Sequence, residues 1–360
     1  MHDEWVRHRD SNRFFRNMQT IVSSGVALNL KEELSFVTMT AAFIVVANCF
    51  IDGYTGLDGS QHGAILGFLP GPLALPSLPF SISLPALSLL LVFRTNTAYG
   101  RWNEARTLWG GVVNTCRNVA RQSNAFYPDT PQGDDLRERM VANTAAFAYC
   151  LRAFLRGPDD NEKLRSQLMD LEAKGQMPRA QVEACMAAAN RPMFQLAAMS
   201  ANLKEADIGS MDRARIDTSI SLLADLTSAC ERIFKSPVPL VYTRLTARFL
   251  TTFLVLLPMG LWQVTGESWN HWATIPATFV IAFFLFGIEE IGIQIEEPFS
   301  ILPLEALCNG AFGGRHLAAG PFSFGCVAAR FLLMRSLLLR RVNREVPCAA
   351  HACWPCVLAI

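Results

Sequence analysis

Apolar residues are concentrated in four stretches of the chain that contain no Asp, Glu, Lys or Arg. These stretches are residues 34–51, 59–93, 249–266 and 268–288, with lengths of 18, 35, 18 and 21 residues. A helix needs about 20 mostly apolar residues to cross the hydrocarbon layer of a bilayer, and buried soluble helices seldom reach that length without a charge. The pattern therefore predicts four membrane-spanning helices.

Proline content distinguishes the first two stretches. Leu34 to Ile51 contains no proline, which is typical of a single regular crossing. Because proline removes an amide donor and clashes with the preceding turn, a proline-rich stretch cannot be one regular helix throughout. For the second stretch we expect an irregular or re-entrant approach from Gly63 to Pro76 and a helix from about Leu78 to Phe93. Its prolines are Pro70, Pro72, Pro76, Pro79 and Pro85.

The last two stretches are separated only by Glu267, beside Gly266, Asn270 and His271. This predicts a helical hairpin of roughly residues 245–262 and 272–292, with a tight turn between them. Tryptophan is typical of membrane interfaces, and three tryptophans bracket the turn: Trp262, Trp269 and Trp272.

Basic residues predict the orientation of the spans. Residues 1–33 carry five Arg and Lys, whereas residues 52–63 and 263–271 carry none. Because positively charged loops stay on the inner face, both termini and the middle of the chain are expected on one side of the membrane.

The middle segment, residues 94–248, holds 38 of the 63 charged residues, yet apolar positions recur in it at helical spacing. We expect an all-helical extramembrane domain, because strand-like alternation is absent. Within it, the residues between Pro158 and Ala180 are expected to be exposed. One periodic run comprises Ile216, Ile220, Leu223, Leu226, Thr227, Cys230 and Phe234.

Composition supports the membrane interpretation and narrows the function. The chain is 51% hydrophobic and 18% charged, whereas charged residues make up about a quarter of an ordinary soluble protein. The net charge of +1 gives no basic excess of the kind that binds nucleic acid, so no nucleic-acid partner is expected. The six histidines are scattered and no nucleotide-binding or hydrolase motif occurs. We therefore expect no enzymatic activity and no cofactor.

Carboxylates gather after the fourth apolar stretch, and oxygen clusters of this kind suit hard cations. We favour the alternative that they pair with arginines of the middle segment, so no metal site is predicted and they stand only as weak metal candidates. They are Glu289, Glu290, Glu296 and Glu297.

Leu78, Ile82 and Ala86 fall at positions i, i+4 and i+8, on one face of the predicted second helix. Such a narrow apolar stripe more often forms a helix–helix contact than a pore lining. The nearby hydroxyls of Ser81 and Ser83, and the backbone groups freed by proline, favour the pore interpretation.

Three long motifs resemble the bestrophin-like family of anion channels, and most closely its plastid branch in plants and algae, described as voltage-dependent chloride channels. The resemblance covers about residues 2–308 and follows the order of the chain. The motifs are SLLLVFRTNTAYGRWNEARTLWGG (88–111), PVPLVYTR (237–244) and FFLFGIEEIGIQIEEPFSILPLEALC (283–308).

The resemblance implies a pentamer with an axial pore, each subunit giving four spans and a helical extramembrane domain. It places a hydrophobic neck at Leu78, Ile82 and Ala86, around Pro79, and a second, inner constriction at Val238. Ala86 is smaller than the side chain that family necks often carry there, which predicts a wider inner end. The acidic run that binds calcium in animal members is interrupted here by residues 291–295, so calcium activation is not implied.

The expected fold class is therefore an all-α integral membrane protein, a bestrophin-like pentamer with four transmembrane helices per subunit and a helical extramembrane domain. Beyond the spans, the expected segments are an N-terminal segment, a juxtamembrane acidic segment and a divergent tail. The N-terminal segment is residues 1–33, and the first two spans with the proline-rich pore segment are 34–93. The helical extramembrane domain is 94–248 and the transmembrane hairpin 249–292. The juxtamembrane acidic segment is 293–308 and the tail 309–360.

The expected function is passive, anion-selective conduction of chloride, with voltage dependence; the alternative is a bicarbonate channel that supplies inorganic carbon in an algal plastid. Arg94, Arg101 and Arg106 would concentrate anions near the neck. Arg94 could instead be structural, paired with Glu104 or with an acid near the fourth span. The expected location is the chloroplast thylakoid membrane, the alternatives being the plasma membrane or another plastid membrane.

Overall fold

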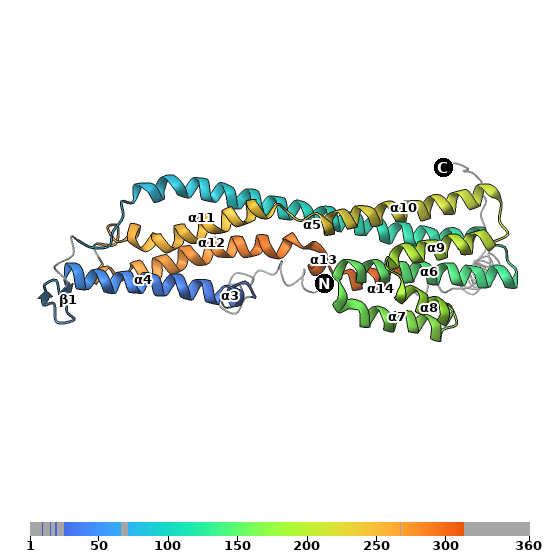
Figure 1. Ribbon diagram of the computed structural model, residues 1–360, viewed down its shortest axis with the longest axis horizontal. Helices are drawn as coiled ribbons and strands as arrows, with labels where there is room; N and C mark the ends of the chain where they lie inside the picture. Colours follow the sequence, from blue (N-terminus) through green and yellow to red (C-terminus); the bar gives the residue numbers. More distant parts are fainter. Residues whose placement is uncertain are drawn as a thin grey trace, which may run out of the picture.

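The computed structural model describes residues 25–65, 71–266 and 268–312, together with Arg9, Phe15 and Gln19. The described chain forms an elongated helical molecule with two halves end to end along one axis (Figure 1). One half contains the apolar helices and the other a bundle rich in charged residues. The predicted tail, residues 309–360, lies outside the described residues from position 313 onward, and so does Glu267.

Four helices of the described chain are long and apolar enough to cross a membrane. Leu34–Ile51 lies within α4 (Lys31–Asp52), and the predicted hairpin is formed by α11 (Leu240–Leu261) and α12 (Thr274–Glu296). A short helix, α3 (Gly25–Asn29), precedes α4. The spans share an apolar core that includes Leu34, Val37, Leu87, Leu91, Leu250, Leu254, Ala282 and Phe286.

The remaining span belongs to α5 (Leu78–Phe126), which continues far beyond Phe93. Its 49 residues correspond to a length of about 70 Å at 1.5 Å per residue. The expected boundary between residues 93 and 94 therefore falls inside one unbroken helix. Figure 1 shows α5 running from the membrane half into the extramembrane half, so the two halves share one rigid element.

The extramembrane half is all-helical, as expected. Helices α6 (Pro131–Arg156) and α10 (Ser210–Lys235) pack against the second part of α5, and α9 (Arg191–Glu205) packs against both of them. Two short helices, α13 (Pro298–Ile301) and α14 (Leu304–Phe312), return from the end of α12 and complete the bundle. Its core includes Trp109, Phe147, Leu151, Met199, Ile216, Leu223, Phe299 and Cys308.

Helical periodicity predicted the buried face of α10 with one exception. Ile216, Leu223 and Cys230 are buried as expected, but Phe234 is 47% exposed. The helix ends at Lys235, and the Phe234 ring lies beside that of Phe154, with the ring centroids 6.1 Å apart. Phe234 therefore contacts a neighbouring helix at the edge of the core instead of entering it.

The expectation that residues between Pro158 and Ala180 are exposed holds at most of these positions, but it missed a buried stripe of Leu164, Leu168, Leu171 and Met177. A 3-10 turn, η1 (Pro158–Asp160), leads into α7 (Asn161–Ala173), which is followed by α8 (Arg179–Ala187). Helix α7 repeats leucine at helical spacing and packs against α6 and α8. The second, smaller core formed in this way, the satellite core, comprises Ala146, Cys150, Ala153, Leu164, Leu168, Leu171, Met177, Val182 and Cys185.

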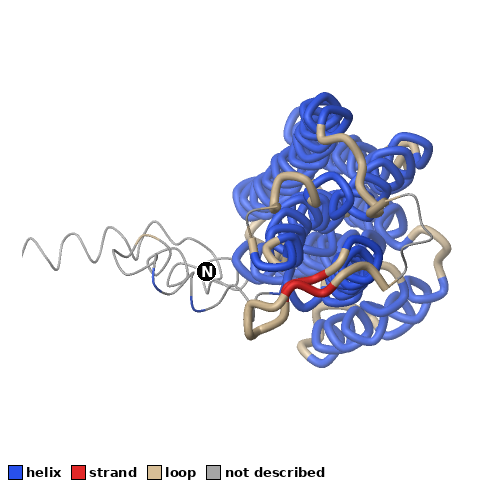
Figure 2. Tube along the Cα trace, turned by 90° about the vertical axis from the view of Figure 1, so that its left-hand side faces the viewer, coloured by secondary structure: helices blue, strands red, loops and turns tan. Residues whose placement is uncertain are grey.

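The outer turns contain two very short antiparallel strands, β1 (Tyr54–Thr55) and β2 (Gln61–His62), which the sequence did not indicate. Figure 2, seen from this end, shows them across the ends of the helices. The turn between α11 and α12 contains η2 (Trp269–His271). Its Asn270, at φ 47°, binds the backbone of Thr55 twice: Oδ1 accepts from N–H at 2.7 Å and Nδ2 donates to C=O at 2.8 Å.

We expect Leu168→Ala to destabilise the protein by about 2–5 kcal/mol, because it removes a fully buried side chain from the satellite core. The matched control is Met169→Ala, since Met169 is 42% exposed and should change stability by no more than about 0.5 kcal/mol. Unfolding of the purified protein in detergent, followed by circular dichroism, gives both values. Equal effects of the two substitutions would contradict a packed core beneath α7.

Candidate pore-lining site

The backbone that leads into α5 is irregular and is held from both sides. Asn48, fully buried on α4, donates from Nδ2 to the carbonyl of Leu73 at 3.2 Å and accepts from its N–H at 2.6 Å. Two residues later, the N–H of Leu75 donates to the carbonyl of Met259 on α11 at 3.1 Å. Non-helical backbone at membrane depth must find such partners, because lipid offers none. These contacts therefore fix the start of α5 relative to two other spans.

The first turn of α5 packs closely against α11 through Phe80 and Gly260. A Cβ atom at Gly260 would lie 2.6 Å from the Phe80 ring, so the ring occupies the space that only glycine leaves. Phe80 also makes an edge contact with Phe253, at 5.7 Å between ring centroids. The rotation of α5 about its axis is set by this fit, together with Leu87 and Leu91, which are buried on the same face.

The opposite face of α5 presents the stripe predicted from the sequence. Leu78 and Ile82 are 66% and 68% exposed, and Ala86 is also exposed. The hydroxyls of Ser81 and Ser83 do not add donors to this face, because they donate to the carbonyls of Ser77 and Phe80 at 3.2 and 3.3 Å. The free face at this end of α5 is therefore apolar.

Arg94 forms a buried ion pair with an acid of the fourth span. Its Nη1 donates to Oε1 of Glu289 at 2.7 Å, and the two side chains are 5% and 11% exposed. Glu104, the other partner considered, pairs instead with Arg232. Because the charge of Arg94 is compensated by Glu289, this guanidinium contributes little net field to ions outside the bundle.

Arg101 joins the ends of two helices. It donates to the carbonyls of Ile233 and Ser236 at 2.8 and 2.7 Å, near the end of α10, and to that of Glu296 at 3.4 Å, the last residue of α12. Helix C-termini leave carbonyls without intrahelical donors, and a cation there also interacts favourably with the helix dipole. Arg101 therefore has a structural role, since its hydrogen bonds join the ends of α10 and α12. Arg106, by contrast, is exposed on α5.

Val238 lies half-buried in the short connection between α10 and α11. The flanking residues, Pro237 and Pro239, restrict the backbone to extended geometry and exclude continuation of α10. The position of the predicted inner constriction is thus a stiff link between the two halves.

The four glutamates considered as weak metal candidates are divided among different contacts. Glu289 is paired with Arg94, and Glu290 accepts hydrogen bonds from Asn29 and Gln294 at 2.9 and 2.8 Å. In the described ranges, no group of three or more His, Cys, Asp or Glu side chains is placed to hold a metal ion.

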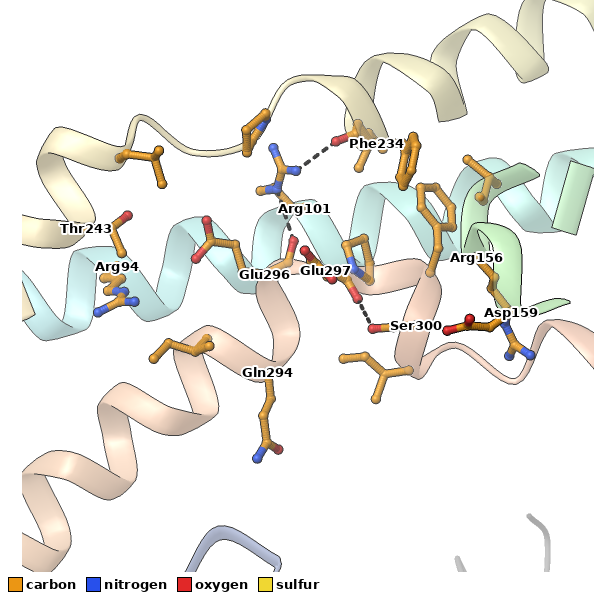
Figure 3. Close-up of a pocket in the computed structure, with 18 of the residues that line it drawn as sticks. Arg94, Arg101, Arg156, Asp159, Phe234, Thr243, Gln294, Glu296, Glu297 and Ser300 are labelled. Atoms are coloured by element: carbon orange, nitrogen blue, oxygen red, sulfur yellow. Dashed lines mark hydrogen bonds between the residues drawn. The ribbon is translucent and has the colours of Figure 1, made fainter. Parts of the chain in front are cut away.

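Glu296 and Glu297 line a cleft of about 1230 Å³ between the two halves. Figure 3 shows basic side chains around it, including Arg101 and Arg156, as well as the acidic ones. They come from helices of both the membrane half and the bundle. Phe234, near the end of α10, and Thr243, in the first turn of α11, also line the cleft. The cleft is therefore a mixed polar and apolar surface at the junction, without a single dominant charge.

These features define an integral membrane protein with four spanning helices and a helical extramembrane domain. The chain belongs to the bestrophin family: a family model described as "Bacterial/Fungal Bestrophin protein" matches residues 4–312. The recognised motifs, and the family that they indicated, are confirmed.

Relatives of the chain include plant and bacterial proteins. It is 32% identical to "Voltage-dependent chloride channel 1, chloroplastic" of Arabidopsis thaliana over 86% of this chain and 70% of the relative. It is 33% identical to "Voltage-dependent anion channel-forming protein alr2987" of Nostoc over 66% of this chain and 76% of the relative. A crystal structure of a bacterial Bestrophin homologue from Klebsiella pneumoniae has the same fold, with a TM-score of 0.63, 22% identity and coverage of 79% and 95%.

Three residues that position α5 were missed by sequence reasoning: Asn48, Phe80 and Gly260. Asn48 had a usable signal, because an amide within an otherwise apolar span is costly unless it has a partner. Phe80 and Gly260 had none, since each is ordinary in a membrane helix and only their apposition gives them a role.

We expect Glu289→Gln to destabilise the protein by about 3 kcal/mol, because it leaves the buried Arg94 charge without a counter-charge. Replacing both residues, Arg94→Met with Glu289→Met, should recover most of that loss, since neither charge then remains. Thermal unfolding in detergent measures both effects. Glu290→Gln is the control and should be nearly neutral, because its partners are uncharged amides. A double variant no more stable than Glu289→Gln would contradict the ion pair.

Gly260→Ala should lower stability by about 1–3 kcal/mol, since the new methyl group would overlap the Phe80 ring. Gly287→Ala, on α12, is the matched control because no atom lies within 4 Å of the Cβ it would add. Combining Gly260→Ala with Phe80→Ala should make the two changes less than additive, which a double-mutant cycle detects. Strict additivity would show that the two side chains do not compete for the same space.

Proposed function

We propose that the protein is a passive, anion-selective channel that conducts chloride with voltage dependence, and that five copies surround the pore. The bestrophin family membership and the names of the relatives support anion conduction. The observation that carries the pore assignment is the exposed apolar stripe of Leu78, Ile82 and Ala86, opposite the packed face of α5. A stripe left uncovered in one subunit is available to face an axis shared by several.

In this proposal the neck is lined by Leu78 and Ile82, with Pro79 at the start of the helix and Ala86 at its wider inner end. Helix α5 begins at Leu78, so its N-terminal dipole points toward the neck. Each such dipole favours an anion by about 0.3–1 kcal/mol. Five weak attractions select the sign of the ion and still permit its exit.

The arginines divide their roles in this mechanism. Arg94 and Arg101 act chiefly as structural cations, because Glu289 and the helix-end carbonyls engage them. Arg106, exposed on α5, is the arginine of the three assigned to concentrate anions in the extramembrane vestibule. Val238, on the stiff link between α10 and α11, forms the second constriction. No catalytic step is assigned, so the protein is proposed to be a channel and not an enzyme.

Bicarbonate is the second candidate ion. The neck is apolar and its serine hydroxyls donate to the backbone, so no side-chain donor there distinguishes chloride from another monovalent anion. We propose the chloroplast as the location, because the Arabidopsis relative is named chloroplastic, and within it the thylakoid membrane; the alternatives are the plasma membrane or another plastid membrane.

Purified protein in planar bilayers tests the proposal directly. We expect Ala86→Phe to reduce single-channel conductance several-fold by narrowing the inner end of the neck. The pair Leu78→Ala with Ile82→Ala should increase it, because the apolar barrier is shortened. Leu84→Ala is the control: Leu84 is 40% exposed but lies on a different face of α5.

The same recordings show which anion the channel prefers and whether its opening depends on voltage. Replacing chloride by bicarbonate on one side shifts the reversal potential by an amount set by the logarithm of the permeability ratio, and voltage steps reveal voltage dependence. Unchanged conductance in both neck variants would contradict the neck assignment. Absence of anion current from correctly assembled wild-type protein would contradict the channel itself.

A further inference from the structure

Two cysteines of the extramembrane half face each other in the satellite core. Cys150 on α6 and Cys185 on α8 have their sulfur atoms 3.6 Å apart, and both side chains are fully buried. A disulfide has a sulfur–sulfur distance of about 2.05 Å, so bond formation needs an approach of about 1.5 Å. The two thiols are therefore in contact but not yet bonded.

A buried amide is directed at one of the two sulfurs. Gln195 on α9, fully buried, donates from Nε2 to Sγ of Cys185 at 3.2 Å. The amide oxygen of Gln195 has no hydrogen-bond partner among the described residues, so the contact with sulfur is the one its side chain makes there. An N–H donor stabilises a thiolate more than a thiol, because the negative charge is a much stronger acceptor.

The surroundings make the two sulfurs unequal. Because Gln195 donates to Cys185, the Cys185 sulfur is the acceptor of the pair; a hydrogen bond from Cys150, opposed by burial and aided by Gln195 and the positive charge of Arg191, lowers the pKa of Cys185. The same hydrogen bond, together with burial, raises the pKa of Cys150. Cys185 is thus the nucleophile and Cys150 the partner that keeps its proton.

Other buried cysteines lack this arrangement. Burial raises the pKa of Cys230 and that of Cys308 to about 12, so both remain thiols at neutral pH. Since the thiolate is the reactive form of cysteine, oxidation should favour the pair in the satellite core over Cys230 and Cys308.

Helix α8 is the element that can supply the approach. It is nine residues long and buries only two side chains, Val182 and Cys185. It is connected through Pro178 on one side and residues 188–190 on the other, outside the central bundle. A displacement of about 1.5 Å, the approach that the bond requires, therefore disturbs one short helix and leaves α5 and its neighbours in place.

We propose that Cys150 and Cys185 form a thiol modification site that hydrogen peroxide converts to an intramolecular disulfide. The Cys185 thiolate attacks one peroxide oxygen and breaks the O–O bond, which converts Cys185 to a sulfenic acid. The released hydroxide takes a proton to give water. The Cys150 sulfur then attacks that sulfur, its proton and the leaving hydroxyl form a second water, and the S–S bond closes. Two thiols and one peroxide give one disulfide and two waters.

The burial of both sulfurs favours a small oxidant of this class over a protein disulfide, which would need direct access. The product would tie α8 to α6 across a chain separation of 35 residues. Since a cross-link restricts the unfolded chain, the oxidised protein should unfold at a higher temperature than the reduced protein.

Purified full-length protein in detergent, reduced and then treated with graded hydrogen peroxide, tests the proposal. After free thiols are alkylated, trypsin should release peptides 140–152 and 180–204 joined by a disulfide with a mass two hydrogens below their sum. Cys185→Ser should abolish this product and leave Cys150 alkylated. Cys150→Ser should instead trap the sulfenic acid at Cys185, detected by dimedone. Cys230→Ser is the matched control and should cross-link like the wild type.

Two results would overturn the proposal. One is full alkylation of both cysteines in wild-type protein at peroxide concentrations that already oxidise Cys230 or Cys308. The other is a disulfide product that leaves the unfolding temperature unchanged, or that raises it in a way that reductant does not reverse. The wild-type measurements stand without the variants, so a variant that fails to fold does not weaken the test.

Discussion

The architecture depends on the continuity of α5. One helix of 49 residues carries the apolar stripe at its beginning, an ion pair to α12 in its middle and the bundle core at its end. A helix is stiff along its hydrogen-bonded backbone, so the orientation of the stripe and that of the extramembrane bundle are not independent. Any rotation of the bundle about α5 must be absorbed by the contacts that fix its start, namely those of Asn48 and Gly260.

Charge at the junction of the two halves is used chiefly for structure. A buried arginine is expensive unless it is paired, and Arg94 meets that requirement with a carboxylate. The partly buried Arg101 is likewise engaged, by helix-end carbonyls. The attraction of anions in the proposed channel therefore rests on helix dipoles and on exposed groups such as Arg106. For Arg94 this follows from pairing: a guanidinium whose charge is compensated by a buried carboxylate has little net field left to act at a distance.

The fold class could be predicted from the sequence because the signals are long and cumulative. Runs of eighteen or more apolar residues without a charge, as in Leu34–Ile51, are rare outside membrane spans, and the periodicity of α10 identified its buried face. Errors came where the signal was short or mixed. Helix α7 alternates three buried leucines with many polar residues, so its packing against α6 could not be distinguished from exposure. Phe234 fitted the period but lies where the helix ends.

For the candidate site, the stripe of Leu78, Ile82 and Ala86 was visible in the sequence because residues four apart share a helical face whatever surrounds them. The partner of Arg94 was narrowed only to Glu104 or an acid near the fourth span, since a separation of 195 residues carries no distance information. The contacts of Asn48, Gly260, Cys150 and Cys185 were decided by tertiary structure alone. Each depends on the position of two helices along their axes and on their rotation about those axes, and both quantities arise from packing the whole bundle. Local spacing sets only the face of a helix on which a side chain lies.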